Sequence, residues 1–260
     1  MKIKIITFII KILGKLYSLI INYTRVIYIS SNVKILNKND IENKITKFEN
    51  KVFIENQKIN CNKLRKYKKH HFFQKILLYA IILKLKKFKD IIYCGYSSQM
   101  FSIYDGYMLS NINKYHFLEY NNRNYYLIDY KNINQKRKVD IDFSKNEINL
   151  IISSSYNINI DDCKNVPNII FDKKIDKINS EYLNDVYNFV KNTLDSCCQN
   201  KEGQKIKRVN IYITAKQSVS FIVGTAIQSY HPDIYIYEYR DNRFKYYMDL
   251  KHDKIMEVNQ

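Results

Sequence analysis

Two segments of this chain repeat one pattern, and no other feature restricts the fold as strongly. Residues 90–129 and 208–249 each begin with a short apolar run, then pass through a small, polar loop into a helical stretch that contains one glycine. Each then enters an alternating run that ends in Glu-Tyr, a polar turn and a last alternating run. When Gly106 is aligned with Gly224, the Glu-Tyr pairs fall within one residue of register. This order of five elements predicts a duplicated strand–loop–helix–strand–strand unit.

Such a duplicated unit predicts an α/β fold with two fused Rossmann-like halves. The first strand of each unit is predicted at 91–94 and 209–213, and the loop after it at 95–99 and 214–218. Between the repeats the sequence predicts three further elements: a strand entering a hydroxyl-rich loop at 149–155, a short strand at 168–171, and a helix at 180–196 with Ser180 as its N-cap.

The loops that follow these first strands are the candidate ligand site. In parallel α/β units such a loop lies at the N-terminus of the next helix, where unpaired N–H groups and the positive helix end bind phosphate. Two such loops in pseudo-symmetric halves are expected to face one crevice, which suits a ligand that itself repeats, such as a ring of nucleotides. The residues predicted to line the site are Tyr96, Ser97, Ser98, Gln99, Ser153, Ser154, Ser155, Ala215, Lys216, Gln217 and Ser218.

A plainer interpretation is that the glycines only permit helix–sheet packing and that the loops are ordinary connectors. For one isolated unit we would favour it, but the duplication favours a shared site.

The N-terminal third differs from the rest of the chain in charge. Of the net charge of +18, residues 1–90 carry 21 Lys and Arg against 5 Asp and Glu, whereas residues 91–260 carry 22 against 20. The excess predicts an anionic partner for this segment, either lipid headgroups or nucleic acid, with solvated surface lysines as the alternative. We divide the chain at residues 1–62, a basic segment, and 63–260, a nucleotide-binding domain.

The apolar stretch at 3–21 is the most hydrophobic part of the basic segment. Its polar residues Lys4, Thr7, Lys11, Lys15 and Ser18 form one stripe on a helix. The two lysines inside the span make a spanning helix unfavourable. An interfacial membrane helix and a helix docked on its own protein both remain open.

Catalytic and metal-binding patterns are weak in this sequence, so neither an enzyme nor a metal or other cofactor is predicted. The five histidines are scattered, and the neighbours His70 and His71 are expected to be a solvated pair beside a basic cluster. Lys216 is expected to neutralise a phosphate; a role in cleaving a bound ring is the weaker alternative because no general base accompanies it. Five cysteines without metal spacing suit a reducing cytoplasm.

The order strand–TAKQS–helix–Gly–strand–Glu-Tyr–strand, best developed over residues 208–250, resembles the SAVED domain of bacterial CBASS anti-phage systems, and the likeness extends over roughly 65–252. That domain is similar to two fused CARF units. The resemblance implies a receptor that binds a cyclic oligonucleotide made by a CD-NTase, oligomerises and switches on an effector. No HNH-like cluster, G-x-S-x-G motif or TIR-sized segment precedes the domain. The resemblance therefore leaves a membrane-directed N-terminus or a separate effector chain, with the protein in the cytoplasm or at the inner face of the cell membrane.

Two other functional classes stay open: a protein that degrades or sequesters nucleotides, and a nucleic-acid-binding protein that uses the basic N-terminal third.

Overall fold

The computed structural model describes residues 25–31, 38–48, 51–56, 63–82, 90–110, 114–121, 124–199, 203–240 and 243–258. The apolar stretch at 3–21, for which a membrane-associated or docked helix is predicted, lies outside the described residues. Among the helices within these ranges, none combines the length and apolar character needed to cross a membrane.

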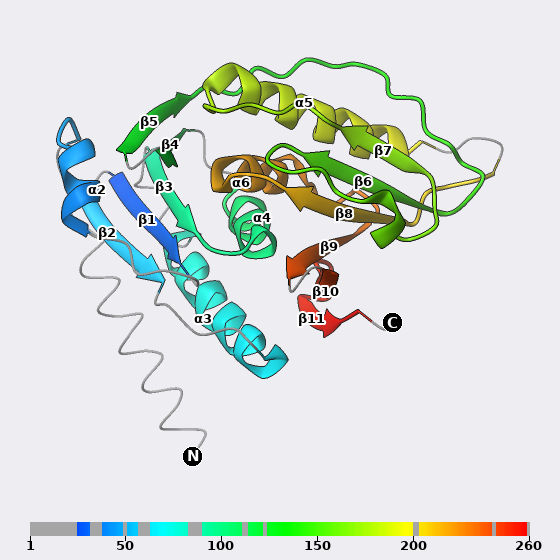
Figure 1. Ribbon diagram of the computed structural model, residues 1–260, viewed down its shortest axis with the longest axis horizontal. Helices are drawn as coiled ribbons and strands as arrows, with labels where there is room; N and C mark the ends of the chain where they lie inside the picture. Colours follow the sequence, from blue (N-terminus) through cyan, green and yellow to red (C-terminus); the bar gives the residue numbers. More distant parts are fainter. Residues whose placement is uncertain are drawn as a thin grey trace.

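The first half of the molecule is a five-stranded sheet with the order β2-β1-β3-β4-β5 (Figure 1). Four neighbouring strands are parallel, and β5 runs antiparallel to β4. Its strands are β1 Arg25–Ser31, β2 Lys51–Asn56, β3 Asp90–Tyr96, β4 Tyr115–Asn121 and β5 Asn124–Tyr130. Its helices are α2 Lys38–Lys44, α3 Leu64–Ile82 and α4 Gln99–Met108.

The second half is a six-stranded sheet with the order β11-β10-β9-β8-β6-β7. Here too four neighbouring strands are parallel, while β10 is antiparallel to β9 and β11 to β10. Its strands are β6 Glu147–Ser153, β7 Asn168–Phe171, β8 Arg208–Thr214, β9 Asp233–Arg240, β10 Arg243–Asp249 and β11 Lys254–Glu257. Its helices are α5 Ser180–Cys197, α6 Gln217–Ala226 and the 3₁₀ turn η1 Ile160–Asp162.

The predicted duplication is confirmed, and the repeated unit is longer than the sequence indicates. The predicted segments form β3-α4-β4-β5 and β8-α6-β9-β10, with the same order and the same strand directions. In each half two more parallel strands and a helix precede that segment, β1-β2-α3 in the first and β6-β7-α5 in the second. Both halves are therefore complete α/β units.

The boundary predicted between residues 62 and 63 cuts through the first half. Strand β1 pairs along its full length with β3, from Arg25 beside Asp90 to Ser31 beside Tyr96, and β2 pairs with β1. Its centre, Val26–Ile29, is almost completely buried because both faces of a parallel sheet are covered. Strands β1 and β2, both before the predicted boundary, thus belong to the sheet of the first half.

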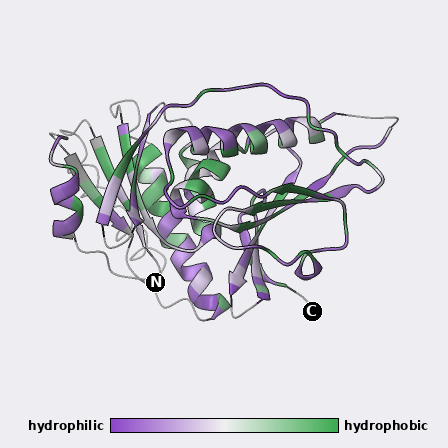
Figure 2. Cartoon of the chain, turned by 45° about the horizontal axis from the view of Figure 1, so that its top comes forward, coloured by the Kyte–Doolittle hydropathy of each residue, from purple (hydrophilic) through white to green (hydrophobic). Residues whose placement is uncertain are grey.

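The two halves meet through helices α4 and α6, which lie side by side between the sheets (Figure 1). A methyl group added at Gly106 would lie 1.9 Å from the carbonyl oxygen of Phe221, and one added at Gly224 would lie 2.0 Å from that of Ile103. Phe221 lies three positions before Gly224, and Ile103 lies three positions before Gly106. The two helices are therefore related by a local pseudo-two-fold axis at this contact. Hydrophobic residues concentrate in the strands and in this helix pair (Figure 2).

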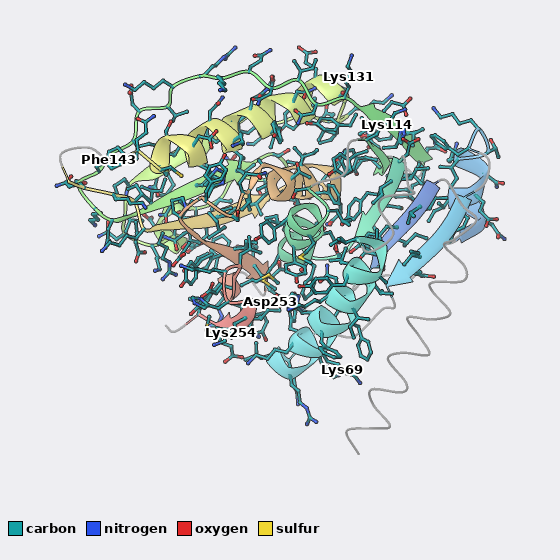
Figure 3. The ribbon with its side chains drawn as sticks, turned by 180° about the vertical axis from the view of Figure 1, so that it is seen from behind. Lys69, Lys114, Lys131, Phe143, Asp253 and Lys254 are labelled. Atoms are coloured by element: carbon teal, nitrogen blue, oxygen red, sulfur yellow. The ribbon has the colours of Figure 1, made fainter. Side chains whose placement is uncertain are left out.

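A long extended segment, residues 131–146, joins the halves by running along the outside of α5. Lys131 and Phe143 mark its course (Figure 3). The carboxamides of Asn184 and Asn188 bracket Ile133, with its N–H donated to Asn184 and its carbonyl accepting from Asn188, both at 2.8 Å. Asn192 continues this ladder by donating to the carbonyl of Gln135, two residues further along, at 2.8 Å. Four helical residues rise about 6 Å, close to the length of two extended residues, so the spacings match.

Helix α5 itself begins one residue away from the predicted cap. The side chain of Asn179, not Ser180, accepts the N–H of Tyr182 at 2.8 Å. Asparagine satisfies the first turn as well as serine does, so a cap one residue earlier serves the helix equally well.

Candidate functional site

The two predicted loops meet where α4 and α6 begin. The side-chain amide of Gln99 donates to the carbonyl of Ala215 at 2.7 Å, and that of Gln217 donates to the carbonyl of Ser97, also at 2.7 Å. The two amides also lie 3.3 Å apart, with Gln217 Nε2 donating to Gln99 Oε1. Each glutamine therefore reaches across the pseudo-two-fold to the loop of the other half. We call this contact the loop crossing.

The third predicted loop, after β6, lies beside the same place. The N–H groups of Ser154 and Ser155 donate to the carbonyl of Thr214 at 2.9 and 2.8 Å. The hydroxyl of Ser154 accepts from Tyr182 at 2.8 Å, and that of Ser153 accepts the N–H of Ile158 at 3.4 Å. This loop is thus joined to the second of the two loops at the crossing.

The predicted residues differ in what they offer to a ligand. Tyr96 is 37% exposed and Ser155 is exposed, while Gln99, Lys216 and Gln217 are partly exposed. The remaining six are buried and hold the loops in shape: Ser97, Ser98, Ser153, Ser154, Ala215 and Ser218. The ammonium group of Lys216 donates to the carbonyl of Asp176 at 2.8 Å.

Two glutamates occupy the helix N-termini, where free N–H groups are expected from the sequence. Oε1 of Glu119, on β4, accepts the N–H of Ser218 at 2.8 Å, at the second residue of α6. Oε2 of Glu238, on β9, accepts the N–H of Met100 at 3.3 Å, at the second residue of α4. For these two N–H groups the expectation is wrong, because a protein carboxylate already satisfies each of them. Each glutamate caps the helix of the opposite half.

Burial dominates the electrostatics of both carboxyls. Each glutamate is 7% exposed. Burial raises the pKa of Glu238 to about 7, although the N–H of Met100 and the hydroxyl of Tyr67 favour the charged form. Burial also raises the pKa of Glu119, while the hydrogen bonds from Ser218 and the charge of Lys216 oppose that rise. The glutamates were visible in the sequence only as register markers, since both repeats end a strand in Glu-Tyr.

A buried polar network runs from the loop crossing into the first half. The hydroxyl of Ser102 donates to the side-chain carbonyl of Gln217 and lies 2.9 Å from the hydroxyl of Ser97. The hydroxyl of Tyr93 lies 3.1 Å from that of Ser102 and 3.2 Å from the carboxylate of Asp105. The helix pair and the crossing therefore share one continuous set of hydrogen bonds.

Asp105 ends this network and is completely buried. It accepts from the amide of Gln74 at 2.8 Å and from the hydroxyl of Tyr28 at 3.1 Å. Burial nevertheless raises its pKa to about 7, since the four hydrogen-bonding side chains around it offset only part of the desolvation. Val223 occupies the aligned position of α6, so the repeat pattern did not reveal this site.

Replacing Asp105 with Asn should remove part of the pH dependence of stability. The folded protein keeps its proton on Asp105 up to about pH 7, whereas an unfolded chain releases it near about pH 4. Lowering the pH from 8 to 5 should therefore stabilise the wild type relative to Asp105→Asn by roughly 1–3 kcal/mol. Urea unfolding of both proteins across this range measures the difference. Burial lowers the pKa values of His70 and His231, so these two groups destabilise the folded protein as the pH falls. Their contribution is the same in both proteins and cancels in the difference between them. A difference that stays constant with pH would contradict the prediction.

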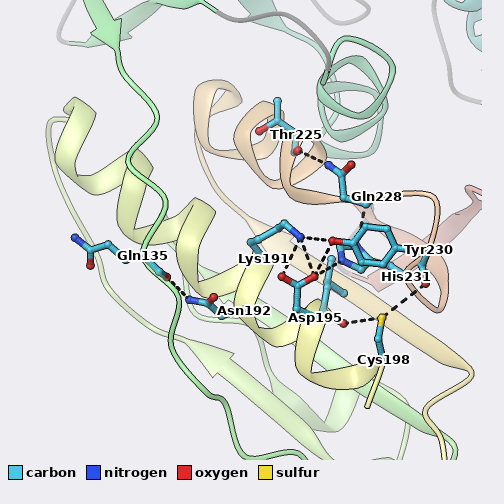
Figure 4. Close-up of polar contacts among 10 residues, drawn as sticks. Gln135, Lys191, Asn192, Asp195, Cys198, Thr225, Gln228, Tyr230 and His231 are labelled. Carbon is cyan, nitrogen blue, oxygen red and sulfur yellow. Dashed lines mark hydrogen bonds and ion pairs between the residues drawn. The ribbon is translucent and has the colours of Figure 1, made fainter. Parts of the chain in front are cut away.

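The histidines have structural surroundings. The prediction of a solvated pair at His70 and His71 is wrong, because both side chains are buried on the inner face of α3. His70 packs on Phe101, and His71 lies 2.6 Å from Asp253. His231 accepts the N–H of Gln228 on Nδ1 and lies 3.0 Å from Asp195, within a cluster at the end of α5 (Figure 4).

Metal ligands do not gather in the described parts of the chain. Within those ranges no group of three or more His, Cys, Asp or Glu side chains is placed to hold a metal ion. Four of the five cysteines are described, at 94, 163, 197 and 198, and all four are free thiols.

Two fused Rossmann-like halves, with strand–loop–helix junctions that meet on a pseudo-two-fold, define a two-half sensor-type α/β domain. The chain belongs to the SAVED family, described as the SMODS-associated and fused to various effectors sensor domain, whose family model matches residues 75–250. The predicted family and fold class are thereby confirmed. No curated protein matches the sequence.

Among solved structures, the fold is similar to that of the Acinetobacter baumannii Cap4 SAVED/CARF-domain containing receptor. The similarity to its complex with the cyclic trinucleotide 3'3'3'-cAAA has a TM-score of 0.51 at 13% identity, covering 86% of this chain and 51% of that chain. For the complex with 2'3'3'-cAAA the TM-score is 0.51 at 14% identity, covering 86% and 50%. A third structure of that receptor gives 0.50 at 13%, covering 86% and 49%. This chain thus spans about half the length of these receptors, and the likeness shows the fold.

Proposed function

We propose that this chain is a receptor for a cyclic oligonucleotide signal in bacterial anti-phage defence, with the ligand bound across the loop crossing. The observation that carries the proposal is the reciprocal pair of Gln99 and Gln217 bonds, which places equivalent loops of both halves at one point. Membership of the SAVED sensor family supports it. So do the complexes of the similar Cap4 receptor with cyclic trinucleotides.

The accessible groups around the crossing match the parts of such a ligand. Lys216 supplies a positive charge for a phosphate, and its hydrogen bond is to a backbone carbonyl, which water or a ligand oxygen can replace. The ring of Tyr96 is exposed and can stack on a base. Because two N–H groups of the helix ends are already capped, the phosphate contacts are assigned to Lys216 and the exposed loop edges rather than to those groups.

Replacing Lys216 with Ala should weaken the binding of a cyclic oligonucleotide by about 1–3 kcal/mol, because a charge-assisted phosphate contact is lost. Isothermal calorimetry with a panel of cyclic di-, tri- and tetranucleotides measures the change. Lys251→Ala is the matched control, since Lys251 is exposed and pairs at 2.8 Å with Asp233, the first residue of β9. An unchanged affinity in folded Lys216→Ala would place the site elsewhere.

Receptor action, rather than turnover, is the proposed output. We propose that ligand binding shifts the population toward an oligomer and that the effect passes through the N-terminal segment or a separate effector chain. Light scattering during the same titration should show an increase in mass; a constant mass would count against this step. Recovery of a cleaved ring would instead favour the degrading-enzyme alternative.

Association with an anionic membrane, at the inner face of the cell membrane, is proposed for the N-terminal third. The outer face of α3 supports it, since Phe72 is 52% and Tyr79 is 47% exposed. Basic residues share the helix, including Lys66 and Lys69, the second of which is labelled in Figure 3, and the sequence of the helix contains no acidic residue. Aromatic rings beside lysines are typical of helices at a lipid surface.

The full chain should therefore sediment with vesicles that contain anionic lipid, and Phe72→Ser combined with Lys69→Glu should reduce the sedimented fraction. Deleting residues 1–62 would be a poor test, because it removes β1 and β2 from the sheet. Lys251→Glu is the control for a change of charge alone. Equal sedimentation of both variants, or none of the wild type, would count against the membrane proposal. Binding to DNA with a steep salt dependence would favour the nucleic-acid alternative.

A further inference from the structure

A cavity lies between the two halves, at the end of the α4–α6 pair opposite the loop crossing. Its volume is about 310 Å³. The first half supplies Tyr115 and Tyr130, where β4 begins and β5 ends, and the second half supplies Tyr187 from α5. Amide and hydroxyl groups complete the lining, among them Asn132, Gln228 and Thr225; the last two lie at the end of α6 (Figure 4). The lining side chains within the described residues are all uncharged.

The hydroxyl of Tyr130 points to a missing partner in this cavity. Tyr130 is only 5% exposed, and its hydroxyl has no hydrogen-bond partner among the described residues. Burial raises its pKa, and the neighbouring phenols of Tyr187 and Tyr115 raise it further, so three phenols converge here. The hydroxyl of Tyr115 donates to the carbonyl of Leu109 at 2.6 Å. A buried polar group without a partner is costly, and such groups in native proteins are normally satisfied by a ligand or by ordered water.

The electrostatics of the cavity select against anions. It lies beside Ser110 and Thr225, at the C-terminal ends of α4 and α6, where the helix dipoles place partial negative charge. Among the described lining residues there is no cation that could compensate for this charge. A phosphate group is therefore disfavoured, whereas a neutral ligand with N–H donors is favoured.

The volume of the cavity and the side chains that line it restrict the class of ligand further. The volume is near the lower end of the range of about 300–1,000 Å³ that is usual for small-molecule sites. Tyrosine rings offer stacking surfaces, and the amides of Asn132 and Gln228 can each donate and accept at the edge of a planar ring. We propose that this cavity binds an uncharged nucleobase or nucleoside, in contact with both halves and separate from the site at the loop crossing.

Calorimetry of the full chain with adenosine as the probe, and with AMP as its phosphate-bearing counterpart, tests this proposal. Adenosine should bind saturably and AMP at least fivefold more weakly. Tyr130→Phe should lower the affinity for adenosine by about 2- to 10-fold, the effect of one hydrogen bond. It should fold normally because the hydroxyl it removes has no hydrogen-bond partner in the described parts of the chain. Tyr79→Phe, on the outer face of α3, is the matched control.

Three results would overturn the proposal: no saturable binding of adenosine, equal affinities of the wild type and Tyr130→Phe, or a crystal soaked in adenosine that shows only ordered water in the cavity. None of them bears on the receptor proposal, since no cyclic oligonucleotide is present in these experiments.

Discussion

Gly106→Ala and Gly224→Ala should each lower the free energy of unfolding by about 3 kcal/mol or more, the upper end of overpacking costs. In an ordinary helix the same change is stabilising by about 0.5–1 kcal/mol. Here the added methyl groups would lie 1.9 Å and 2.0 Å from backbone carbonyl oxygens of the partner helix. A backbone atom cannot turn aside as a flexible side chain can, so α4 and α6 would have to separate.

Urea denaturation followed by circular dichroism measures the loss. Gly203→Ala is the matched control, because a methyl group there meets no atom within 4 Å and the only cost is the strain of its φ of +79°, about 1–2 kcal/mol. Wild-type stability in Gly106→Ala and Gly224→Ala would show that the helices are not in backbone contact and that the two halves do not meet in this way.

Glu238→Ala should lower the free energy of unfolding by about 2–4 kcal/mol, because it removes the acceptor of two buried donors. The N–H of Met100 would lose its partner, and the hydroxyl of Tyr67, 3.2 Å from Oε1, would lose this acceptor. Glu238→Gln should cost less than about 1 kcal/mol, since it keeps an acceptor oxygen and resembles the protonated carboxyl. A pKa raised to about 7 means that a neutral side chain is already well tolerated at this position.

The same pair of changes at Glu119 should show the same order, with alanine worse than glutamine, because Glu119 caps α6 as Glu238 caps α4. Both series are measured by chemical denaturation at pH 7. If alanine and glutamine had equal effects at either position, the hydrogen bonds across the halves would not be what stabilises the helix N-termini.

The sequence was sufficient to predict the duplicated part of the fold. The prediction rested on two features that occur at matching positions in both segments. These are one glycine in each short helix and one Glu-Tyr pair at the end of the strand that follows it. Both features turn out to be inter-half contacts, since the glycines form the helix crossing and the glutamates cap the opposite helices. Residues constrained in this way differ least between two copies of a unit.

The strands that precede each repeated segment could not be paired from the sequence. The apolar run of β1 at Val26–Ile29 and that of β6 do not share a pattern that would align them. The helical segments after them, α2 and η1, also differ in length and sequence. Membership of a sheet depends on the pairing of residues far apart in the chain, such as Arg25 beside Asp90, and the local sequence pattern does not record that pairing. The boundary at residues 62–63 is misplaced for this reason.

The candidate site was predicted as a set of loops, but not in its chemistry. Proximity followed from topology, because the carboxyl ends of adjacent parallel strands lie at one edge of each sheet. The capping by Glu119 and Glu238 did not follow from topology, since it requires the relative placement of the two halves and joins residues that are 99 and 138 positions apart. The burial of Asp105 likewise depends on tyrosine hydroxyls from two other strands.

The position of a bound cyclic oligonucleotide tests the shared site most directly. The measurement is a crystal structure of the full chain with the ring that binds best in calorimetry. We expect the ring to contact residues 96–99 of the first half and 214–218 of the second, with a phosphate oxygen within hydrogen-bond distance of Lys216 Nζ. A ring that contacts only one half, or that lies away from the Gln99–Gln217 crossing, would contradict a site shared by both halves.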